Sequence, residues 1–197
     1  MIMEIDFITS NKGKIAALKR SFLNAGRFDI KVNQVQADIV EPQLNNIADV
    51  SKYKAMEAFK ILKKPILVED GGLVIEALNG FPGPYTKYVL STIGIDGILK
   101  LMNGENNRAA KFVSFATFVG NDGTVCQFER FGDNFEIAYE RKNVHPDAWS
   151  DLWQVMYMKD YGKMLCEFSK QELSDFTERS QTSGSLQQFA KWFLEKY

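Results

Sequence analysis

The sequence has few residues that bind transition metals or form disulfides. Its 197 residues include two cysteines, Cys126 and Cys166, and one histidine, His145. The cysteines lie far apart and form no CxxC or His–Cys spacing, and a single histidine cannot build a zinc site alone. The sequence therefore excludes a zinc centre, and we expect two buried free thiols in a reducing cytosol.

Net charge is nearly absent as well. The 24 Lys+Arg stand against 25 Asp+Glu, which gives a formal net charge of −1. Without an excess of positive charge there is no general attraction to a nucleic-acid backbone. We therefore expect no nucleic-acid partner, and any phosphate chemistry has to come from a local site.

Long apolar runs and a targeting segment are also missing. No run approaches the roughly 18 apolar residues that a membrane span needs. The first residues, MIMEIDFITSNKGK, carry acidic Glu4 and Asp6 and lack a basic-then-apolar leader. We expect no membrane partner and a cytoplasmic protein.

What remains is the composition of a folded globular protein, 45% apolar and 25% charged, with no repeat or linker. We expect one domain over residues 1–197. Apolar spacing predicts strands at 2–9 and 65–69, one or two strands within 28–40, and helices at 14–25, 47–62 and 88–102, the last interrupted at Gly94. It also predicts a hairpin over 110–131 turning at 121–123, short strands in the tail, and a terminal helix at 186–196. This order indicates a mixed α/β sheet with helices packed on it.

The turn after the first strand is a candidate phosphate site. It brings hydroxyls, an amide, a glycine and two ammonium groups to the start of a helix: Thr9, Ser10, Asn11, Lys12, Gly13 and Lys14. Backbone N–H groups and the positive end of the helix dipole favour anions there, and Lys14 adds a point charge. The turn is not a Walker A loop, and a polar turn that only caps a helix is the alternative.

Two carboxylates, Glu69 and Asp70, follow the apolar strand at 65–69 and precede Gly71 and Gly72. We expect them at a strand end, where open α/β sheets bind ligands and where Mg²⁺ finds carboxylate oxygens. An exposed acidic turn explains them equally well. Glu41 is a further possible metal ligand or an exposed loop charge, and Lys54 by itself indicates a solvated lysine on an apolar helix.

Three segments together resemble a known family. FITSNKGK at 7–14, ILVEDGGLVIEALNGFPGPYTKYVL at 66–90 and RAAKFVSFATFV at 108–119 look like successive signatures of the inosine triphosphate pyrophosphatase (HAM1-like) family. The resemblance covers roughly residues 5–131, and its middle segment is highly specific.

The resemblance implies hydrolysis of abnormal purine nucleoside triphosphates, such as ITP and XTP, to the monophosphate and pyrophosphate. It implies a long curved mixed sheet with two lobes around a central cleft, a homodimer and dependence on Mg²⁺. By matching position, residues 9–14, Lys54 and Gly71 hold the substrate, Glu41 and Asp70 bind Mg²⁺, and Glu69 is a second acidic group near the metal. Asp70 is also the general base.

The resemblance fails at several positions. Ala17 replaces a glutamate that the family usually carries. Where the family has Arg-Gly, this sequence has Arg141-Lys142-Asn143, and residues 148–152 stand in place of the family's Gly-Phe-Gly-Tyr-Asp-Pro loop. Only Arg141 and Asp151 remain as equivalents. The base-reading Lys-Asn and Ser-His-Arg fall on Leu173-Ser174 and 177–179 in one register, which includes Arg179, or on 180–182 in another.

These changes predict an altered or lost preference for 6-oxopurines, because charge-assisted contacts to a base edge discriminate best. Trp149, Trp153 and Phe176 offer stacking surfaces instead, with packing in the core as the alternative. Trp149, Asp151 and Arg179 are the remaining substrate-binding candidates. A catalytically weak nucleotide sensor on the same fold is the competing functional hypothesis.

Overall fold

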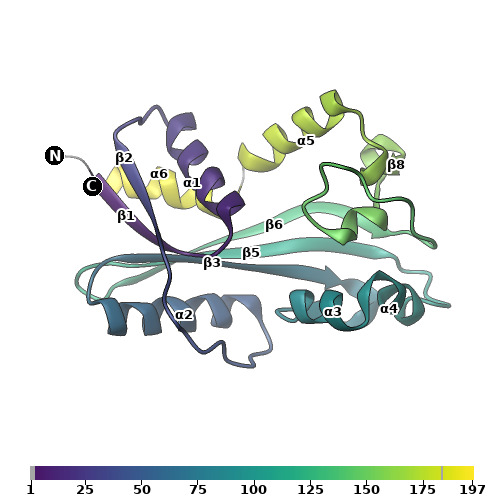
Figure 1. The fold of residues 1–197 in the computed structure, drawn as a ribbon, viewed down its shortest axis with the longest axis horizontal. Helices are drawn as coiled ribbons and strands as arrows, with labels where there is room; N and C mark the ends of the chain where they lie inside the picture. The colour runs from purple at the N-terminus through teal and green to yellow at the C-terminus, as the bar shows by residue number, and fades with distance from the viewer. Residues whose placement is uncertain (1–2, 183) are drawn as a thin grey trace. The chain divides into compact units, whose positions relative to one another are not determined.

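The protein is built on one mixed β-sheet flanked by helices (Figure 1). The computed structural model describes residues 3–182 and 184–197, without the side chains of Asp133 and residues 180–182. The strands are β1 Met3–Ile8, β2 Ile30–Val35, β3 Ile66–Ile75, β4 Pro82–Gly83, β5 Ala109–Val119, β6 Val125–Ile137, β7 Met156–Met158 and β8 Lys163–Met164. The α-helices are α1 Lys12–Asn24, α2 Ile47–Leu62, α3 Thr86–Thr92, α4 Gly94–Leu101, α5 Lys170–Thr182 and α6 Ser185–Lys196, with 3₁₀ turns at Glu76–Leu78, Asp151–Gln154, Lys159–Tyr161 and Leu165–Glu167.

The order of the strands places β1 and β3 together in the sheet. In the described part of the chain the order is β2-β1-β3-β5-β6-β7-β8, with β4 paired to β3. β1 pairs parallel with β2 and β3, whereas β4 on β3, β7 on β6 and β8 on β7 are antiparallel. This mixed sheet confirms the predicted fold class.

The chain divides into two compact units. The first consists of residues up to Gly71, Ser114–Arg130 and Arg179–Tyr197, and the second of Gly72–Val113 and Phe131–Glu178. Strands β3, β5 and β6 contribute to both units. The expectation of one domain over the whole chain stays a prediction.

In the first unit, helices cover both faces of the sheet (Figure 1). Phe7 and Leu67 pack against α1 and α6, in a core that includes Phe189. Ile8 and Val68 point to the opposite face and pack against α2. Because side chains alternate along a strand, every residue of β3 in this unit is directed either to α1 and α6 or to α2.

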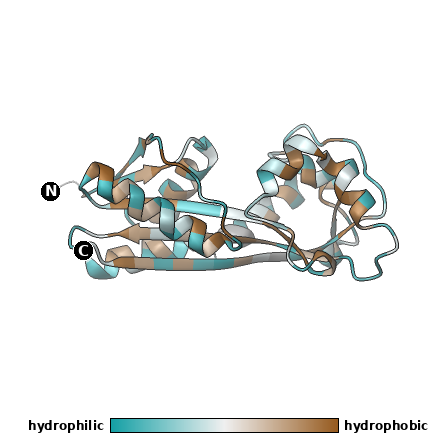
Figure 2. Cartoon of the chain, turned by 90° about the horizontal axis from the view of Figure 1, so that it is seen from below, coloured by the Kyte–Doolittle hydropathy of each residue, from teal (hydrophilic) through white to brown (hydrophobic). Residues whose placement is uncertain are grey.

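The helices are amphipathic, and Figure 2 shows hydrophobic and hydrophilic residues side by side along them. Two asparagines cap the helices that matter for the site. The Asn11 side chain accepts hydrogen bonds at the start of α1, and the Asn46 side chain accepts one from the Asp49 N–H at the start of α2. Each cap satisfies backbone donors that the first turn leaves without a partner inside the helix.

The second unit has its own apolar core, which includes Leu73, Ile98 and Phe135. Arg108 is buried there, and its guanidinium donates to the carbonyls of Met102, Ile137 and Ala138 at 2.6–2.7 Å. These charge-assisted hydrogen bonds satisfy a cation that would otherwise be costly to bury.

Most predicted elements are confirmed, and the differences have identifiable causes. The helix at 47–62 is α2, and Gly94, with a φ of 63°, separates α3 from α4 as expected. The predicted end of the third strand at Glu69 was wrong, because β3 continues through both glycines to Ile75 and pairs with β4 near that end. The predicted second hairpin strand also extends further, to Ile137.

Helix α5 was missed, although a capping box marks its start. The Glu172 carboxylate accepts from the Ser169 N–H at 2.7 Å, and the Ser169 hydroxyl accepts from the Glu172 N–H at 3.3 Å. Serine followed three residues later by glutamate is a recognised helix-start pattern.

The pH dependence of stability tests this start of α5. The Lys163 ammonium and the Ser169 cap lower the pKa of Glu172 from 4.5 to about 2. The ionised carboxylate therefore stabilises the folded state fully above about pH 4.5, and this contribution disappears as the pH falls through about 2. We expect Glu172→Gln to lower the free energy of unfolding at pH 7 and to match the wild type as the pH approaches 2.

Urea unfolding of both proteins between pH 7 and pH 2 measures the effect. Glu178→Gln, at an exposed glutamate further along α5, serves as the control and should change little at any pH. A stability difference for Glu172→Gln that does not shrink below pH 4.5 would contradict this role of the carboxylate.

Candidate active site

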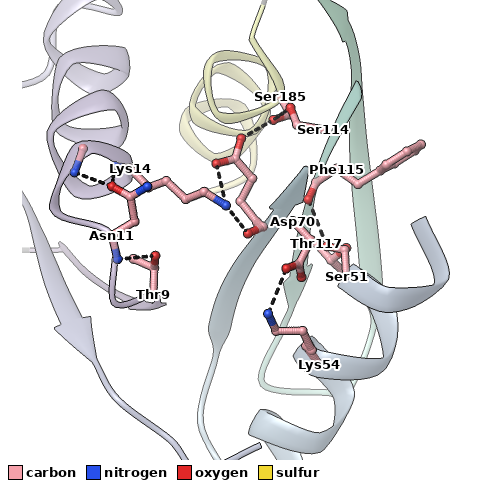
Figure 3. A network of polar contacts seen from close by, with 12 residues as sticks. Thr9, Asn11, Lys14, Ser51, Lys54, Asp70, Ser114, Phe115, Thr117 and Ser185 are labelled. Atoms are coloured by element: carbon pink, nitrogen blue, oxygen red, sulfur yellow. Dashed lines mark hydrogen bonds and ion pairs between the residues drawn. The ribbon is translucent and has the colours of Figure 1, made fainter. Parts of the chain in front are cut away.

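The predicted phosphate turn forms the capped start of α1. The Thr9 hydroxyl accepts from the Asn11 N–H at 3.0 Å, and the Asn11 side-chain oxygen accepts from the N–H groups of Gly13 at 2.8 Å and Lys14 at 3.4 Å (Figure 3). A Cβ at Gly13 would lie 3.0 Å from that Asn11 oxygen, so glycine suits this position. Ser10 and Lys12 are exposed on the turn. The turn therefore offers polar groups and positive charge at a helix N-terminus.

The two carboxylates of β3 point to opposite faces of the sheet. Glu69 shares its face with Leu67, toward α1 and α6, whereas Asp70 shares its face with Val68, toward α2. They lie inside the strand, because β3 does not end where the sequence predicted. Adjacent residues of an extended strand alternate, so their side chains serve two different environments.

Asp70 belongs to a cluster with Lys54 and Glu41. The Lys54 ammonium lies 2.8 Å from Asp70 Oδ1 and 2.6 Å from Glu41 Oε1. The Lys54 and Asp70 side chains are 15% and 18% exposed, whereas Glu41 is 67% exposed. The default expectation of a solvated Lys54 was therefore wrong, because the fold places two carboxylates around it.

The electrostatics of this cluster keep Lys54 positively charged. Burial acts to lower the pKa of Lys54, but the charges and hydrogen bonds of Asp70 and Glu41 outweigh it and raise the pKa. A protonated lysine in the same compact unit as the predicted phosphate turn can neutralise negative charge on a substrate.

The same cluster fits a divalent cation. Asp70 Oδ2 is buried and has no hydrogen-bond partner in the described part of the chain. A buried anionic oxygen without a donor is costly, and a bound cation would relieve that cost. No group of three or more His, Cys, Asp or Glu that could hold a metal occurs among the described residues. Mg²⁺, however, commonly binds through one or two carboxylates together with substrate phosphates, and Glu41 and Asp70 provide that number.

Glu69 has a different set of partners. Its Oε1 accepts from the Ser185 hydroxyl at 2.7 Å, while the Lys14 ammonium donates to its main-chain carbonyl at 2.6 Å and lies 3.7 Å from its Oε2. Figure 3 shows Lys14, Ser114 and Ser185 on the side of the network away from Lys54. These contacts do not support a metal-binding role for Glu69, which stays a prediction.

Comparison with known proteins identifies the chain. The model of the Ham1 family matches residues 5–189. The chain belongs to the Ham1 family. This result confirms the resemblance to inosine triphosphate pyrophosphatases and extends it over the tail.

Two curated Ham1-family relatives align along nearly their whole length. A protein of Methanopyrus kandleri named dITP/XTP pyrophosphatase is 42% identical, over 97% of this chain and 96% of the relative. A protein of the same name from Methanothermobacter marburgensis is 34% identical, over 99% and 98%.

Solved structures support the fold. The Ham1 protein of Staphylococcus aureus superposes with a TM-score of 0.77 at 20% identity, covering 98% of this chain and 100% of that one. A dITP/XTP pyrophosphatase of Mycobacterium abscessus gives a TM-score of 0.76 at 19% identity, covering 91% of this chain and 95% of that one.

No helix within residues 3–182 and 184–197 is long and apolar enough to cross a membrane.

The remaining predicted residues of this Ham1-family chain are more scattered. Gly71 is an exposed residue within β3, next to Asp70. Trp149 and Asp151 belong to the second unit, and Arg179 lies in α5. Residues 177–179 are part of that helix, whereas the side chains of 180–182 lie outside the described part of the chain.

The aromatic candidates separate clearly by exposure. Trp153 is 5% exposed and Phe176 packs against the core, so for these two the packing alternative is confirmed. Trp149 is 65% exposed, and its ring lies 5.5 Å from Phe112. Cys126 and Cys166 are free but only half-buried, which corrects the expectation of buried thiols.

Sequence reasoning missed the polar residues that fasten α2 to β5. The Ser51 hydroxyl contacts the Thr117 hydroxyl at 2.8 Å and donates to the Phe115 carbonyl at 2.9 Å (Figure 3). Ser51 and Thr117 are fully buried, and Gln127 donates to Thr117 at 2.9 Å. Ser51 lies three residues before Lys54, so this network fixes the helix from which Lys54 reaches Asp70. The only signal in the sequence was a polar residue at an apolar position of α2.

Proposed function

We propose that this chain is a metal-dependent nucleoside triphosphate pyrophosphohydrolase that acts on abnormal purine nucleotides and releases the monophosphate and pyrophosphate. The observation that carries the proposal is the cluster of Asp70, Lys54 and Glu41 in the same compact unit as the phosphate turn. Relatives named dITP/XTP pyrophosphatase, 42% and 34% identical over nearly the whole chain, support the substrate class.

The residues of the candidate site have distinct parts in the proposed reaction. The start of α1, Lys14 and Lys54 bind the phosphates and neutralise their charge. Asp70 orients a water molecule and accepts its proton as the water oxygen bonds to the α-phosphorus. The bond from the α-phosphorus to the oxygen bridging to the β-phosphorus then breaks, and pyrophosphate leaves with that oxygen.

Mg²⁺ is the proposed metal, with Glu41 and Asp70 as its protein ligands. When bound, it would supply positive charge to the phosphates and lower the pKa of a coordinated water. Carboxylate oxygens together with phosphates are the ligands that Mg²⁺ prefers, which supports this choice over a softer metal.

Two observations point to different preferences for the nucleobase of the substrate. The names of the relatives favour hypoxanthine and xanthine, whereas the replaced base-reading residues predict an altered preference. Trp149 is an exposed aromatic surface suited to stacking on a base, and Asp151 and Arg179 stay proposed polar contacts. A homodimer in the cytoplasm completes the proposal, and light scattering on the purified protein tests the dimer.

A nucleotide panel tests the proposed function. Pyrophosphate release is measured for ITP, dITP, XTP and the four standard nucleoside triphosphates, with Mg²⁺ and with excess EDTA. We expect turnover of at least one abnormal purine nucleotide at a kcat/KM about tenfold or more above that for ATP and GTP, and loss of turnover in EDTA.

Two results would contradict the proposal in different ways. Nucleotide binding without turnover in any metal would indicate the sensor instead. Turnover that is undiminished by EDTA would contradict the metal dependence but not the hydrolase activity.

A further inference from the structure

Glu69 is held by a chain of hydroxyl groups that the proposed reaction does not use. Ser185 is the first residue of α6 and is 1% exposed. Its hydroxyl donates to Glu69 Oε1 at 2.7 Å and lies 3.0 Å from the Ser114 hydroxyl on β5 (Figure 3). A serine hydroxyl has one proton to donate. Because Ser185 gives its proton to Glu69, Ser114 must donate to Ser185. The hydrogen bonds therefore run from Ser114 to Ser185 and from Ser185 to Glu69.

The other side of Glu69 faces the phosphate-binding lysine. Within the described residues, β1 pairs with β3 at Leu67 and Val68, so Glu69 is the first residue of β3 beyond that ladder. Its main-chain carbonyl accepts from Lys14 Nζ at 2.6 Å, whereas its Oε2 stays 3.7 Å from the same nitrogen. A distance of 3.7 Å is too long for a hydrogen bond. The ammonium therefore uses one of its three N–H donors on Glu69, and two stay available for phosphate.

We propose that Ser185 is a positioning residue for phosphate binding, which acts on Lys14 through the carboxylate of Glu69. Lys14 and Glu69 already form a loose ion pair at 3.7 Å, and by holding Oε1 the Ser185 hydroxyl keeps the carboxylate from closing to hydrogen-bonding distance of the Lys14 ammonium. Without that hydroxyl, the Glu69 carboxylate, which is 12% exposed, loses its donor, and Lys14 is the nearest cation to replace it. Lys14 would then give its charge to Glu69 instead of to the substrate. The inference rests on the proposed role of Lys14 in phosphate binding.

A double-mutant cycle on a ligand without a base isolates this effect. The affinity of the full-length protein for inorganic tripolyphosphate with Mg²⁺ is measured by calorimetry for the wild type, Ser185→Ala, Lys14→Ala and the double variant. We expect Ser185→Ala to raise the Kd by about five- to tenfold, and to change it by less than about 1.5-fold when Lys14 is already alanine. In nucleotide hydrolysis the same variant should raise KM and leave kcat within about twofold.

Ser21→Ala is the matched control, because Ser21 is also a buried serine of the first unit, with its hydroxyl bonded within α1 to the Ala17 carbonyl. It should leave the Kd unchanged. Should Ser185→Ala fail to fold, Ser114→Ala removes the donor behind Ser185 and should weaken tripolyphosphate binding in the same direction, again only when Lys14 is present.

The outcomes separate this inference from the proposed function. An equal loss of affinity with and without Lys14 would overturn it, since a role in packing α6 does not depend on that lysine. An unchanged Kd in Ser185→Ala, or no binding of tripolyphosphate by the wild type, would overturn it too. The protein could also show the expected dependence of Ser185→Ala on Lys14 in tripolyphosphate binding and yet hydrolyse no nucleotide. That result would support the positioning role of Ser185 and contradict the hydrolase proposal.

Discussion

Replacing Asp70 with asparagine is expected to lower the rate of nucleotide hydrolysis by about a thousandfold, because the proposed base and a metal ligand are lost together. Asparagine keeps the size of the side chain and can still accept a hydrogen bond from Lys54 through its carbonyl oxygen. The fold should therefore survive, since Asp70 lies within the long strand β3 and is not among the residues of the three apolar cores. Steady-state pyrophosphate release under saturating Mg²⁺ measures the effect.

Asp122→Asn is the control for this substitution. Asp122 lies in the first unit, and its carboxylate accepts only from the N–H and hydroxyl of Thr124 in the hairpin turn among the hydrogen bonds described. The same chemical change there should leave kcat within about twofold. If Asp70→Asn kept more than about a tenth of the wild-type rate, Asp70 would not be the base, and the cluster with Lys54 would be structural.

The second large effect is expected for Lys54→Met. Methionine can occupy the space of the lysine stem but brings no charge, so the triphosphate loses a cation and Asp70 Oδ1 loses its partner at 2.8 Å. We expect kcat/KM to fall by about a hundredfold or more. We also expect the free energy of unfolding to fall by about 1–3 kcal/mol without metal, because a nearly buried carboxylate is left unpaired.

Added Mg²⁺ separates the two parts of this prediction. A cation bound by Asp70 and Glu41 replaces the missing positive charge, so Mg²⁺ should stabilise Lys54→Met against urea more than it stabilises the wild type. Lys52→Met, at an exposed lysine on the same helix, controls for the loss of one charge and should leave both activity and stability nearly unchanged. Equal stabilisation of Lys54→Met and wild type by Mg²⁺ would count against a metal site at these carboxylates.

The sequence was most informative where function is encoded in consecutive residues. The turn at 9–14 could be predicted because a strand, a run of small polar groups and a helix start follow one another directly. The carboxylates of β3 could be singled out for the same reason. Their environments could not, because the sequence placed them at a strand end, whereas β3 continues and alternation sends Glu69 and Asp70 to opposite faces.

Partners that are distant in the chain were beyond reach of the same reasoning. Ser185 meets Glu69 across 116 positions, and Lys54 meets Glu41 across 13 positions through an irregular loop. Neither Ser185 nor Lys54 stands in a local pattern that differs from an ordinary helix residue. Helix α5 is a different case, since its capping box was present in the sequence and could have been used.

The products of hydrolysis show which bond of the triphosphate the protein cleaves. Purified protein is incubated with ITP and Mg²⁺, and the phosphate-containing products are separated and quantified, with Asp70→Asn in parallel. We expect inosine monophosphate and pyrophosphate in a one-to-one ratio from the wild type and almost none from the variant. Inosine diphosphate with orthophosphate would place the cleaved bond elsewhere, and equal product from both proteins would contradict the assignment of this site.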